Sequence, residues 1–226
     1  MAILVRRAAN APMHASAFRS WLHEAVSSSF APYVALAVGD STLPLYSGLP
    51  MPDPAWNGKC IIPLDELVPA PRDPEFSFSR RLARALPEAL RPLLSPITPG
   101  PDAGQSAAQL GTAVERDGLA VCVLGLGPDG HIAFNQPGST DDAPTRVVEI
   151  APENLERLGD VAPATHAITL GVRTILRAHA IALVVDGPGK TDAVRRALEG
   201  PEGADAPVSW LRKHPNVVVF VNGNDQ

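Results

Sequence analysis

The fold is decided by the stretch from residue 119 to residue 131, which reads Leu119-Ala120-Val121-Cys122-Val123-Leu124-Gly125-Leu126-Gly127-Pro128-Asp129-Gly130-His131. Its first part is an unbroken apolar run without polar alternation. Such a run is typical of a strand that is buried on both faces, as in a parallel sheet covered by helices. The Gly-rich turn that follows carries an aspartate and a histidine, and ligands of such sheets bind at the loops that leave the carboxyl ends of strands.

The rest of the chain repeats this alternation of apolar runs and helical segments. We predict further strands at residues 3–5, 34–38, 60–62, 180–185 and 217–221, with alternating, strand-like segments at 145–150 and 166–170. Helical spacing predicts helices at residues 16–30, 78–89, 107–116 and 191–198, and a short one at 43–49. The pattern indicates an α/β fold, Rossmann-like and doubly wound, whose mostly parallel sheet has helices on both faces. We expect a single domain over residues 1–226, because the Pro- and Gly-rich loop at 92–104 is the only, weak, candidate boundary.

Composition excludes several classes of function. The 226 residues carry a net charge of -5, with 45% hydrophobic residues, which gives no electrostatic basis for binding nucleic acid or anionic membranes. The sequence has neither a signal peptide at its beginning nor an apolar stretch long enough to cross a membrane, so we expect a cytoplasmic protein. Cys60 and Cys122 have no metal-type spacing and read as small core residues; we expect neither a metal nor another cofactor.

Two nucleotide-binding motifs are matched only in part. Residues 125–130 fit the dinucleotide fingerprint G-x-G-x-x-G, and Glu149 follows at about the expected distance. The helix that this motif requires is broken by Pro137 and Gly138. Residues 187–191 suggest a P-loop, but the pattern requires glycine where Val184 stands. That segment remains either an anion site with one ammonium, from Lys190, or an ordinary helix start with a solvated lysine.

Four polar clusters follow predicted strands, at residues 39–42, 65–66, 129–136 and 187–191. They can converge at one edge of the sheet although they lie far apart in the chain. Asp129 and His131 form the densest of these clusters. A carboxylate two residues from an imidazole can fix its tautomer and suit it to acid–base catalysis, whereas the alternative is an Asp-Gly turn with a surface histidine.

Residues 123–139 closely resemble the signature of the glucosamine-6-phosphate deaminases, which share a superfamily with the 6-phosphogluconolactonases. The continuation Ile132-Ala133-Phe134-Asn135 favours the deaminase branch. The resemblance implies that Asp65 is the base at C2 of the open-chain amino sugar, and that Asp129 and His131 promote ring opening. Gln136 matches a catalytic glutamate that pairs with the histidine. Substrate and phosphate binding is implied for the following residues: Gly39, Asp40, Ser41, Thr42, Gly127, Arg146 and Lys190.

Three features depart from the family pattern. Gln136 can hold an imidazole by hydrogen bonding but cannot stabilise its cation with a negative charge. Asp40 replaces a glycine of the phosphate loop and puts a carboxylate near a dianion. The lid is shortened, and Arg157 is the nearest candidate for its arginine.

The resulting hypothesis is an amino-sugar phosphate deaminase/isomerase that acts on a small-molecule sugar phosphate as a monomer or homodimer. A 6-phosphogluconolactonase and a non-catalytic sugar-phosphate sensor remain alternatives.

Overall fold

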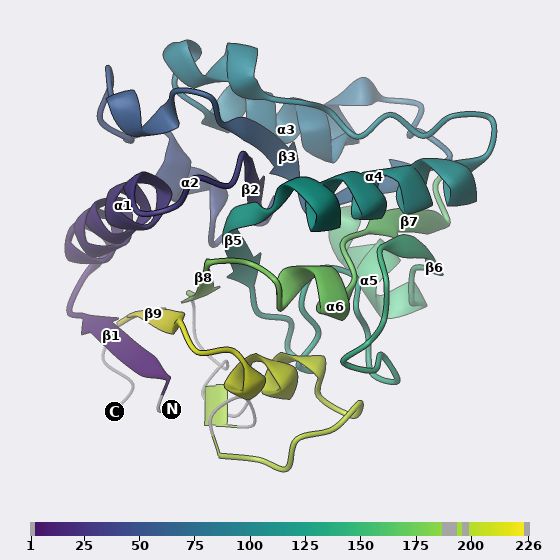
Figure 1. The fold of residues 1–226 in the computed structure, drawn as a ribbon. Helices are drawn as coiled ribbons and strands as arrows, with labels where there is room; N and C mark the ends of the chain where they lie inside the picture. Colours follow the sequence, from purple (N-terminus) through teal and green to yellow (C-terminus); the bar gives the residue numbers. More distant parts are fainter. Residues whose placement is uncertain (1–2, 187–193, 196–198, 224–226) are drawn as a thin grey trace.

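Six parallel strands form the centre of the computed structural model, which describes residues 3–186, 194–195 and 199–223 (Figure 1). Their order across the sheet is β1-β9-β8-β5-β2-β3, and every neighbouring pair is parallel. The predicted parallel sheet is therefore confirmed, and the apolar run from residue 119 forms its inner strand β5. The strands are β1 (Leu4–Ala8), β2 (Tyr33–Leu36), β3 (Cys60–Pro63), β5 (Leu119–Gly125), β8 (Ala180–Val185) and β9 (Val217–Asn222).

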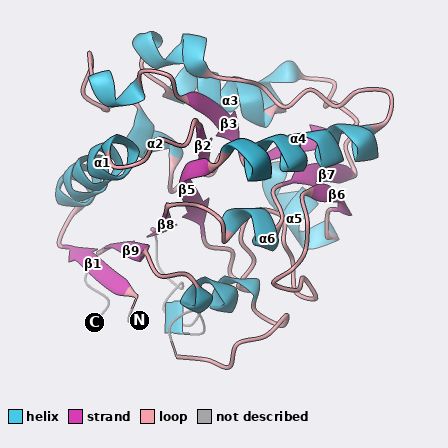
Figure 2. Ribbon diagram, viewed as in Figure 1, coloured by secondary structure: helices cyan, strands magenta, loops and turns pink. Residues whose placement is uncertain are grey.

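Helices cover both faces of this sheet, as predicted (Figures 1 and 2). One face packs against α1 (Ala11–Ser27), α2 (Leu43–Tyr46) and α3 (Phe78–Ala85). The other face packs against α4 (Ala103–Asp117), α6 (Val172–Ile175) and the 3-10 helix η4 (Pro207–Lys213). Three further 3-10 helices are η1 (Pro54–Trp56), η2 (Pro74–Phe76) and η3 (Glu88–Leu93).

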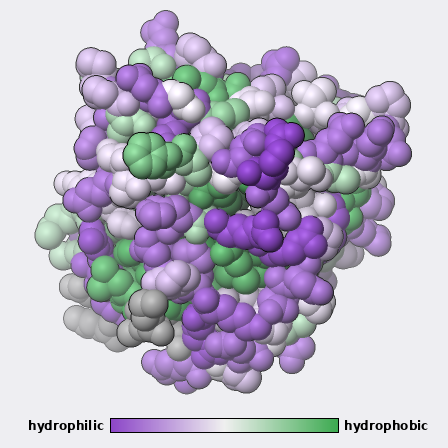
Figure 3. Space-filling model, viewed as in Figure 1, coloured by the Kyte–Doolittle hydropathy of each residue, from purple (hydrophilic) through white to green (hydrophobic). Residues whose placement is uncertain are grey.

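The apolar run of β5 serves both layers at once. Val121 and Val123 point into the cluster under α1, whereas Cys122 and Leu124 point into the cluster under α4, and all four side chains are fully buried. A strand between two helical layers has no polar face, which explains why its sequence shows no alternation. On the face seen in Figure 3, hydrophilic side chains predominate and hydrophobic ones gather in small groups. Among the described residues, no helix has the length and apolar character needed to cross a membrane.

A second, three-stranded antiparallel sheet stands beside the carboxyl end of β3. Its order is β4 (Asp65–Val68), β7 (His166–Thr169), β6 (Arg146–Glu149). The alternating segments at 145–150 and 166–170 were correctly predicted as strands. The strand predicted at 60–62 is followed by strand β4, which was not predicted, because the chain changes sheet at Leu64.

Capping side chains move several helix boundaries away from their predicted positions. The helix predicted at 16–30 begins at Ala11, because the Asn10 side chain accepts the Met13 N–H, and it ends at Ser27. Similarly, Asp102 caps α4, which begins four residues before the predicted start. The helix α5 (Pro152–Leu158) was not predicted. The helix predicted at 191–198 falls almost entirely outside the described residues.

Glu66 joins the small sheet to α3. Its buried carboxylate accepts the backbone N–H groups of Phe78 (3.0 Å) and Ser79 (2.9 Å), the first two residues of that helix, and the Ser77 hydroxyl (3.0 Å). Successive strand residues point to opposite faces, so Glu66 faces the helix start while its neighbour Asp65 faces the other way. Unpaired N–H groups and a positive dipole end make a helix start a favourable place for a carboxylate.

We predict that Glu66→Gln lowers the free energy of unfolding by about 1–3 kcal/mol, since a neutral amide accepts fewer and weaker hydrogen bonds in this buried position. Chemical denaturation measures the change. Glu88→Gln, at an exposed position, is the matched control and should change stability by less than about 0.5 kcal/mol. Equal stability of the Glu66 variant and the wild type would contradict the assigned role.

Candidate active site

One cavity of ≈ 670 Å³ opens at the carboxyl ends of the central strands. The turn after β2 contributes Gly39, Asp40 and Ser41, the loop after β5 contributes Gly127 and His131, and β4 contributes Asp65. Asp186 lines the cavity directly after β8. The predicted convergence is therefore observed for three of the four polar clusters. The fourth, at 187–191 with Lys190, lies outside the described residues.

His131 and Asp129 form a close pair in the loop that follows β5. The imidazole Nδ1 lies 2.6 Å from Asp129 Oδ1, and the same oxygen accepts the His131 backbone N–H at 3.2 Å. This contact indicates that Nδ1 carries a proton and donates it in a hydrogen bond to the carboxylate. Nε2 is then the ring nitrogen that can exchange a proton with a ligand. Gly127 makes room for the ring, because a Cβ at that position would lie only 2.3 Å from imidazole atoms.

Asp65 lies in the cavity wall with its carboxylate in a desolvated position. Burial raises the pKa of Asp65 to about 7, against hydrogen bonds from the Thr169 hydroxyl and the Phe134 backbone N–H that lower it. The Phe134 N–H lies 3.2 Å from Asp65 Oδ1. A carboxyl group with such a pKa can both accept and return a proton near neutral pH.

A compact turn holds the histidine loop against the small sheet. Asn135 is fully buried, and its Nδ2 donates to the carbonyl oxygens of Ile132 (3.1 Å) and Leu170 (2.8 Å). Ala133, at the tip of the turn, has a φ of 51°, a left-handed conformation that is unusual outside glycine. The turn thereby aims the Phe134 N–H at Asp65 and connects the two acid–base groups.

In the turn after β2, the Thr42 side chain faces the protein interior, whereas Asp40 and Ser41 line the cavity. Thr42 is fully buried, accepts the Gly39 N–H at 3.1 Å and donates to backbone carbonyls, so it shapes the turn and does not line the cavity. Asp40 is fully exposed at the cavity wall, and Arg81 of α3 lies 3.5 Å from its carboxylate. The positive guanidinium partly compensates the negative charge of Asp40, which stands where the family has a glycine.

Besides Thr42 and Asp129, two predicted site residues lie outside the cavity wall. Gln136 was expected to contact His131. Its side chain instead donates to the Glu149 carbonyl (2.8 Å) and accepts from the Ala151 N–H (2.7 Å) and Asn154 (3.3 Å). The physical reason is that the start of α5 has no capping side chain of its own, and the amide fills that place.

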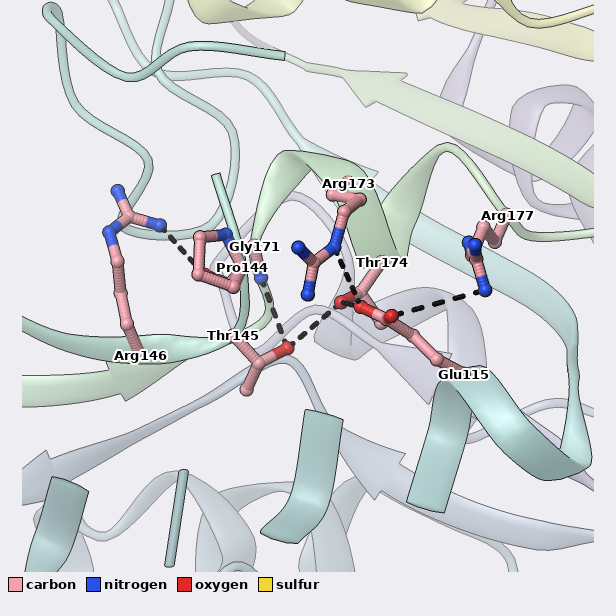
Figure 4. A network of polar contacts seen from close by, with 8 residues as sticks. All are labelled: Glu115, Pro144, Thr145, Arg146, Gly171, Arg173, Thr174 and Arg177. Atoms are coloured by element: carbon pink, nitrogen blue, oxygen red, sulfur yellow. Dashed lines mark hydrogen bonds and ion pairs between the residues drawn. The ribbon is translucent and has the colours of Figure 1, made fainter. Parts of the chain in front are cut away.

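Arg146 was expected to bind substrate but does not line the cavity. Its guanidinium donates to Asn135 Oδ1 (2.9 Å), the Ser139 hydroxyl (3.1 Å) and the Pro144 carbonyl (3.2 Å). Figure 4 shows the Arg146–Pro144 contact beside a separate network around Thr145. Arg146 therefore stabilises the loop after β5, which carries His131, through its hydrogen bond to Asn135.

Sequence reasoning missed several residues of the cavity wall. Asn154, Arg157 and Leu158 come from the unpredicted helix α5, and Phe78 from the start of α3. Arg157 had been named only as the nearest candidate for a lid arginine. Thr169 was missed because its place opposite Asp65 depends on the antiparallel register of β4 and β7, which no local pattern reveals. Among the described ranges, no three His, Cys, Asp or Glu side chains gather as a metal site would require.

The chain resembles curated proteins over most of its length. It is 34% identical over 170 residues to a glucosamine-6-phosphate deaminase of Corynebacterium glutamicum (strain R), covering 70% of this chain and 66% of that protein. The chain thus spans just under two thirds of that relative's length. It is 32% identical over 209 residues to the glucosamine-6-phosphate deaminase of Cutibacterium acnes, covering 85% of this chain and 79% of that protein.

Solved structures share the fold. A monomeric glucosamine-6-phosphate deaminase superposes with a TM-score of 0.82 at 21% identity, over 97% of each chain. A 6-phosphogluconolactonase from Shewanella baltica gives a TM-score of 0.75 at 21% identity, over 98% of this chain and 97% of that one. A sequence model of the glucosamine-6-phosphate isomerases/6-phosphogluconolactonase matches residues 6–220. With a match over nearly its whole length, this chain belongs to the family of glucosamine-6-phosphate isomerases and 6-phosphogluconolactonases.

Proposed function

We propose that this protein is an amino-sugar phosphate deaminase/isomerase that converts glucosamine 6-phosphate, or a close analogue, to a ketose phosphate and ammonia. The observation that carries the proposal is the pairing of two acid–base groups in one cavity. Asp65 has a pKa of about 7, and His131 is oriented by Asp129. Aldose-to-ketose isomerisation needs both a base at C2 and a proton donor and acceptor at the ring oxygen. The two deaminase relatives support the same assignment.

The first step is opening of the sugar ring. His131 protonates the ring oxygen as the bond from C1 breaks and the C1 hydroxyl loses its proton, which gives the open-chain aldehyde. Asp129 accepts a hydrogen bond from Nδ1–H, so Nε2 delivers one proton to the ring oxygen and then recovers one from the C1 hydroxyl. The carboxylate stabilises the imidazolium that is present before the delivery and after the recovery. Gln136 takes no part in this step, because its amide is engaged at the start of α5.

The second step moves the double bond from C1 to C2. The Asp65 carboxylate accepts the C2 proton while the C1 carbonyl oxygen takes up the proton that His131 had recovered, which gives an enolamine. Asp65 then returns its proton to C1, and the nitrogen on C2 becomes a protonated imine. Water adds to C2 of the imine, and ammonia leaves from the same carbon, so the products are the ketose phosphate and ammonia. Each proton taken by Asp65 is returned, so the carboxyl group is regenerated at the end of the cycle.

The phosphate end of the substrate belongs at the turn after β2. Gly39 and Ser41 line the cavity there, and Arg157 of α5, which lines the same cavity, offers a guanidinium. Lys190, outside the described residues, is a further candidate by its position after β8. Asp40 opposes a dianion, and its contact with Arg81 reduces this repulsion. We also propose a single domain over residues 1–226 that acts in the cytoplasm as a monomer or homodimer.

Substitution of Asp65 tests the deaminase directly. Purified protein should release ammonia from glucosamine 6-phosphate, and Asp65→Asn should lower kcat by about 10³-fold, because an amide cannot accept the C2 proton. Asp160→Asn, at an exposed position, is the matched control and should keep wild-type activity. Ammonia release that survives in Asp65→Asn would remove the base from the mechanism.

The same preparation separates the lactonase alternative, which shares the fold. A lactonase would hydrolyse 6-phosphogluconolactone without releasing ammonia, and Asp65 would have no C2 proton to move. Lactone hydrolysis in the absence of deamination would therefore overturn the proposed reaction. Ligand binding without either turnover would indicate a sensor.

The raised pKa of Asp65 also predicts a dependence of stability on pH. Between about pH 4 and pH 7 the folded protein keeps a proton on Asp65 that the unfolded chain has released, so this group's contribution to stability is lost as the pH rises through about 7. Asp65→Asn should therefore be as stable as the wild type at pH 4 and more stable at pH 8, by roughly 2–4 kcal/mol. Denaturation curves at both pH values measure this. A difference that stays constant with pH would show that desolvation does not govern this carboxyl group.

A further inference from the structure

Thr169 lies opposite Asp65 on the adjacent strand. The two residues are register partners in the antiparallel pair of β4 and β7, and their side chains therefore lie on the same face of the small sheet. Thr169 is fully buried, whereas most threonines lie at the surface. A buried hydroxyl needs hydrogen-bond partners.

The direction of the Thr169 hydroxyl proton follows from its contacts. The Phe134 backbone N–H donates to Thr169 Oγ1 at 3.1 Å, which occupies a lone pair of the oxygen. The hydroxyl has one proton, and the acceptor that the geometry offers it is the carboxylate of Asp65, its cross-strand register partner, which shares the Phe134 N–H with it. Thr169 is therefore a donor to Asp65, and the same Phe134 N–H lies 3.2 Å from Asp65 Oδ1. Three groups close a small polar ring in a desolvated wall.

We propose that Thr169 is a positioning residue for Asp65, whose hydroxyl donates to the carboxylate, holds it toward the cavity and stabilises its ionised form. The catalytic consequence rests on the proposed function, whereas the contact itself does not. Without this donor the desolvation of Asp65 would act with only one backbone N–H to oppose it. The carboxylate would then be protonated, and inactive as a base, over most of the neutral range.

Other charges around Asp65 are distributed on several elements and stay unchanged when Thr169 is altered. The titratable and charged groups near it are Glu66 on its own strand, Cys122 on β5, and Asp40, His131, Arg157 and Asp186 around the cavity. A change that follows removal of one hydroxyl is therefore attributable to that hydroxyl.

The test is the titration of the Asp65 carboxyl carbon by ¹³C NMR, with its signal assigned by its loss in Asp65→Asn. Thr169→Val keeps the size and shape of the side chain and removes the donor. We expect the pKa of Asp65 to rise by about one unit in this variant, the size of a hydrogen bond to a charged group. Thr169→Ser restores the hydroxyl and should restore the wild-type titration.

Thr174→Val is the matched control. Thr174, on α6, is also a fully buried threonine and does not line the cavity. Its hydroxyl is hydrogen-bonded to Glu115 of α4 (2.7 Å) and to the Thr145 hydroxyl (3.1 Å) (Figure 4). Its removal should lower stability without moving the Asp65 titration. An equal shift in both variants would mean that any buried hydroxyl has this effect, and would overturn the proposal.

Activity gives an independent readout. For Thr169→Val, kcat/KM of ammonia release should fall about fivefold at pH 7 and recover toward the wild-type value at pH 9, because the acid limb moves by about one unit. A merely structural role would lower activity equally at all pH values. If Thr169→Val folds poorly, Thr169→Cys, with its weak thiol donor, should show a smaller shift in the same direction.

The outcomes separate this proposal from the proposed function. An unchanged Asp65 titration in folded Thr169→Val overturns the positioning role, whether or not the wild type deaminates. A shifted titration in a protein that releases no ammonia keeps the positioning role and rejects the deaminase.

Discussion

The parallel direction of six strands is the constraint on which the site depends. Because every strand runs the same way, the carboxyl ends of β2, β3, β5 and β8 meet at one edge, where a turn follows β2 and a loop follows β5. The order β1-β9-β8-β5-β2-β3 brings the turn after β2 beside the loop after β5. From this pair of strands the chain continues to β3 on one side of the sheet, and to β8 and β9 on the other. The cavity lies in that crevice, and burial of β5 between two helical layers makes its floor rigid.

The small antiparallel sheet then adds what the large sheet cannot supply. It turns two adjacent carboxyl residues to opposite sides, so that Glu66 satisfies the start of α3 while Asp65 enters the cavity wall. The first stabilises the fold. The second costs stability at neutral pH, because its desolvation opposes ionisation, and the protein retains it where a base is useful. Hydrogen bonds from Arg146 to Asn135, and from Asn135 to the Leu170 carbonyl, hold the loop that carries His131.

The sequence was sufficient to predict the parallel sheet and the pairing of Asp129 with His131. It was insufficient to predict contacts made across strands. The apolar run before Gly125 identified β5, and the short spacing of Asp129 and His131 made their contact a local matter. Gln136 and Arg146 were misplaced because the partners that hold them, on α5 and in the loop before β6, come together only through the tertiary fold. Thr169 carried no signal at all, since the register of an antiparallel pair is set by packing and not by the residue itself.

The central claim is that Asp65 and His131 face the same sugar from two sides of one cavity. The measurement that tests it most directly is a crystal structure of Asp65→Asn with glucosamine 6-phosphate bound. The account predicts the sugar in the cavity at the ends of β2 and β5, with C2 within about 3.5 Å of the side chain at position 65 and the ring oxygen within hydrogen-bond reach of His131 Nε2. A sugar bound with C2 turned away from position 65, or bound outside this cavity, would contradict it.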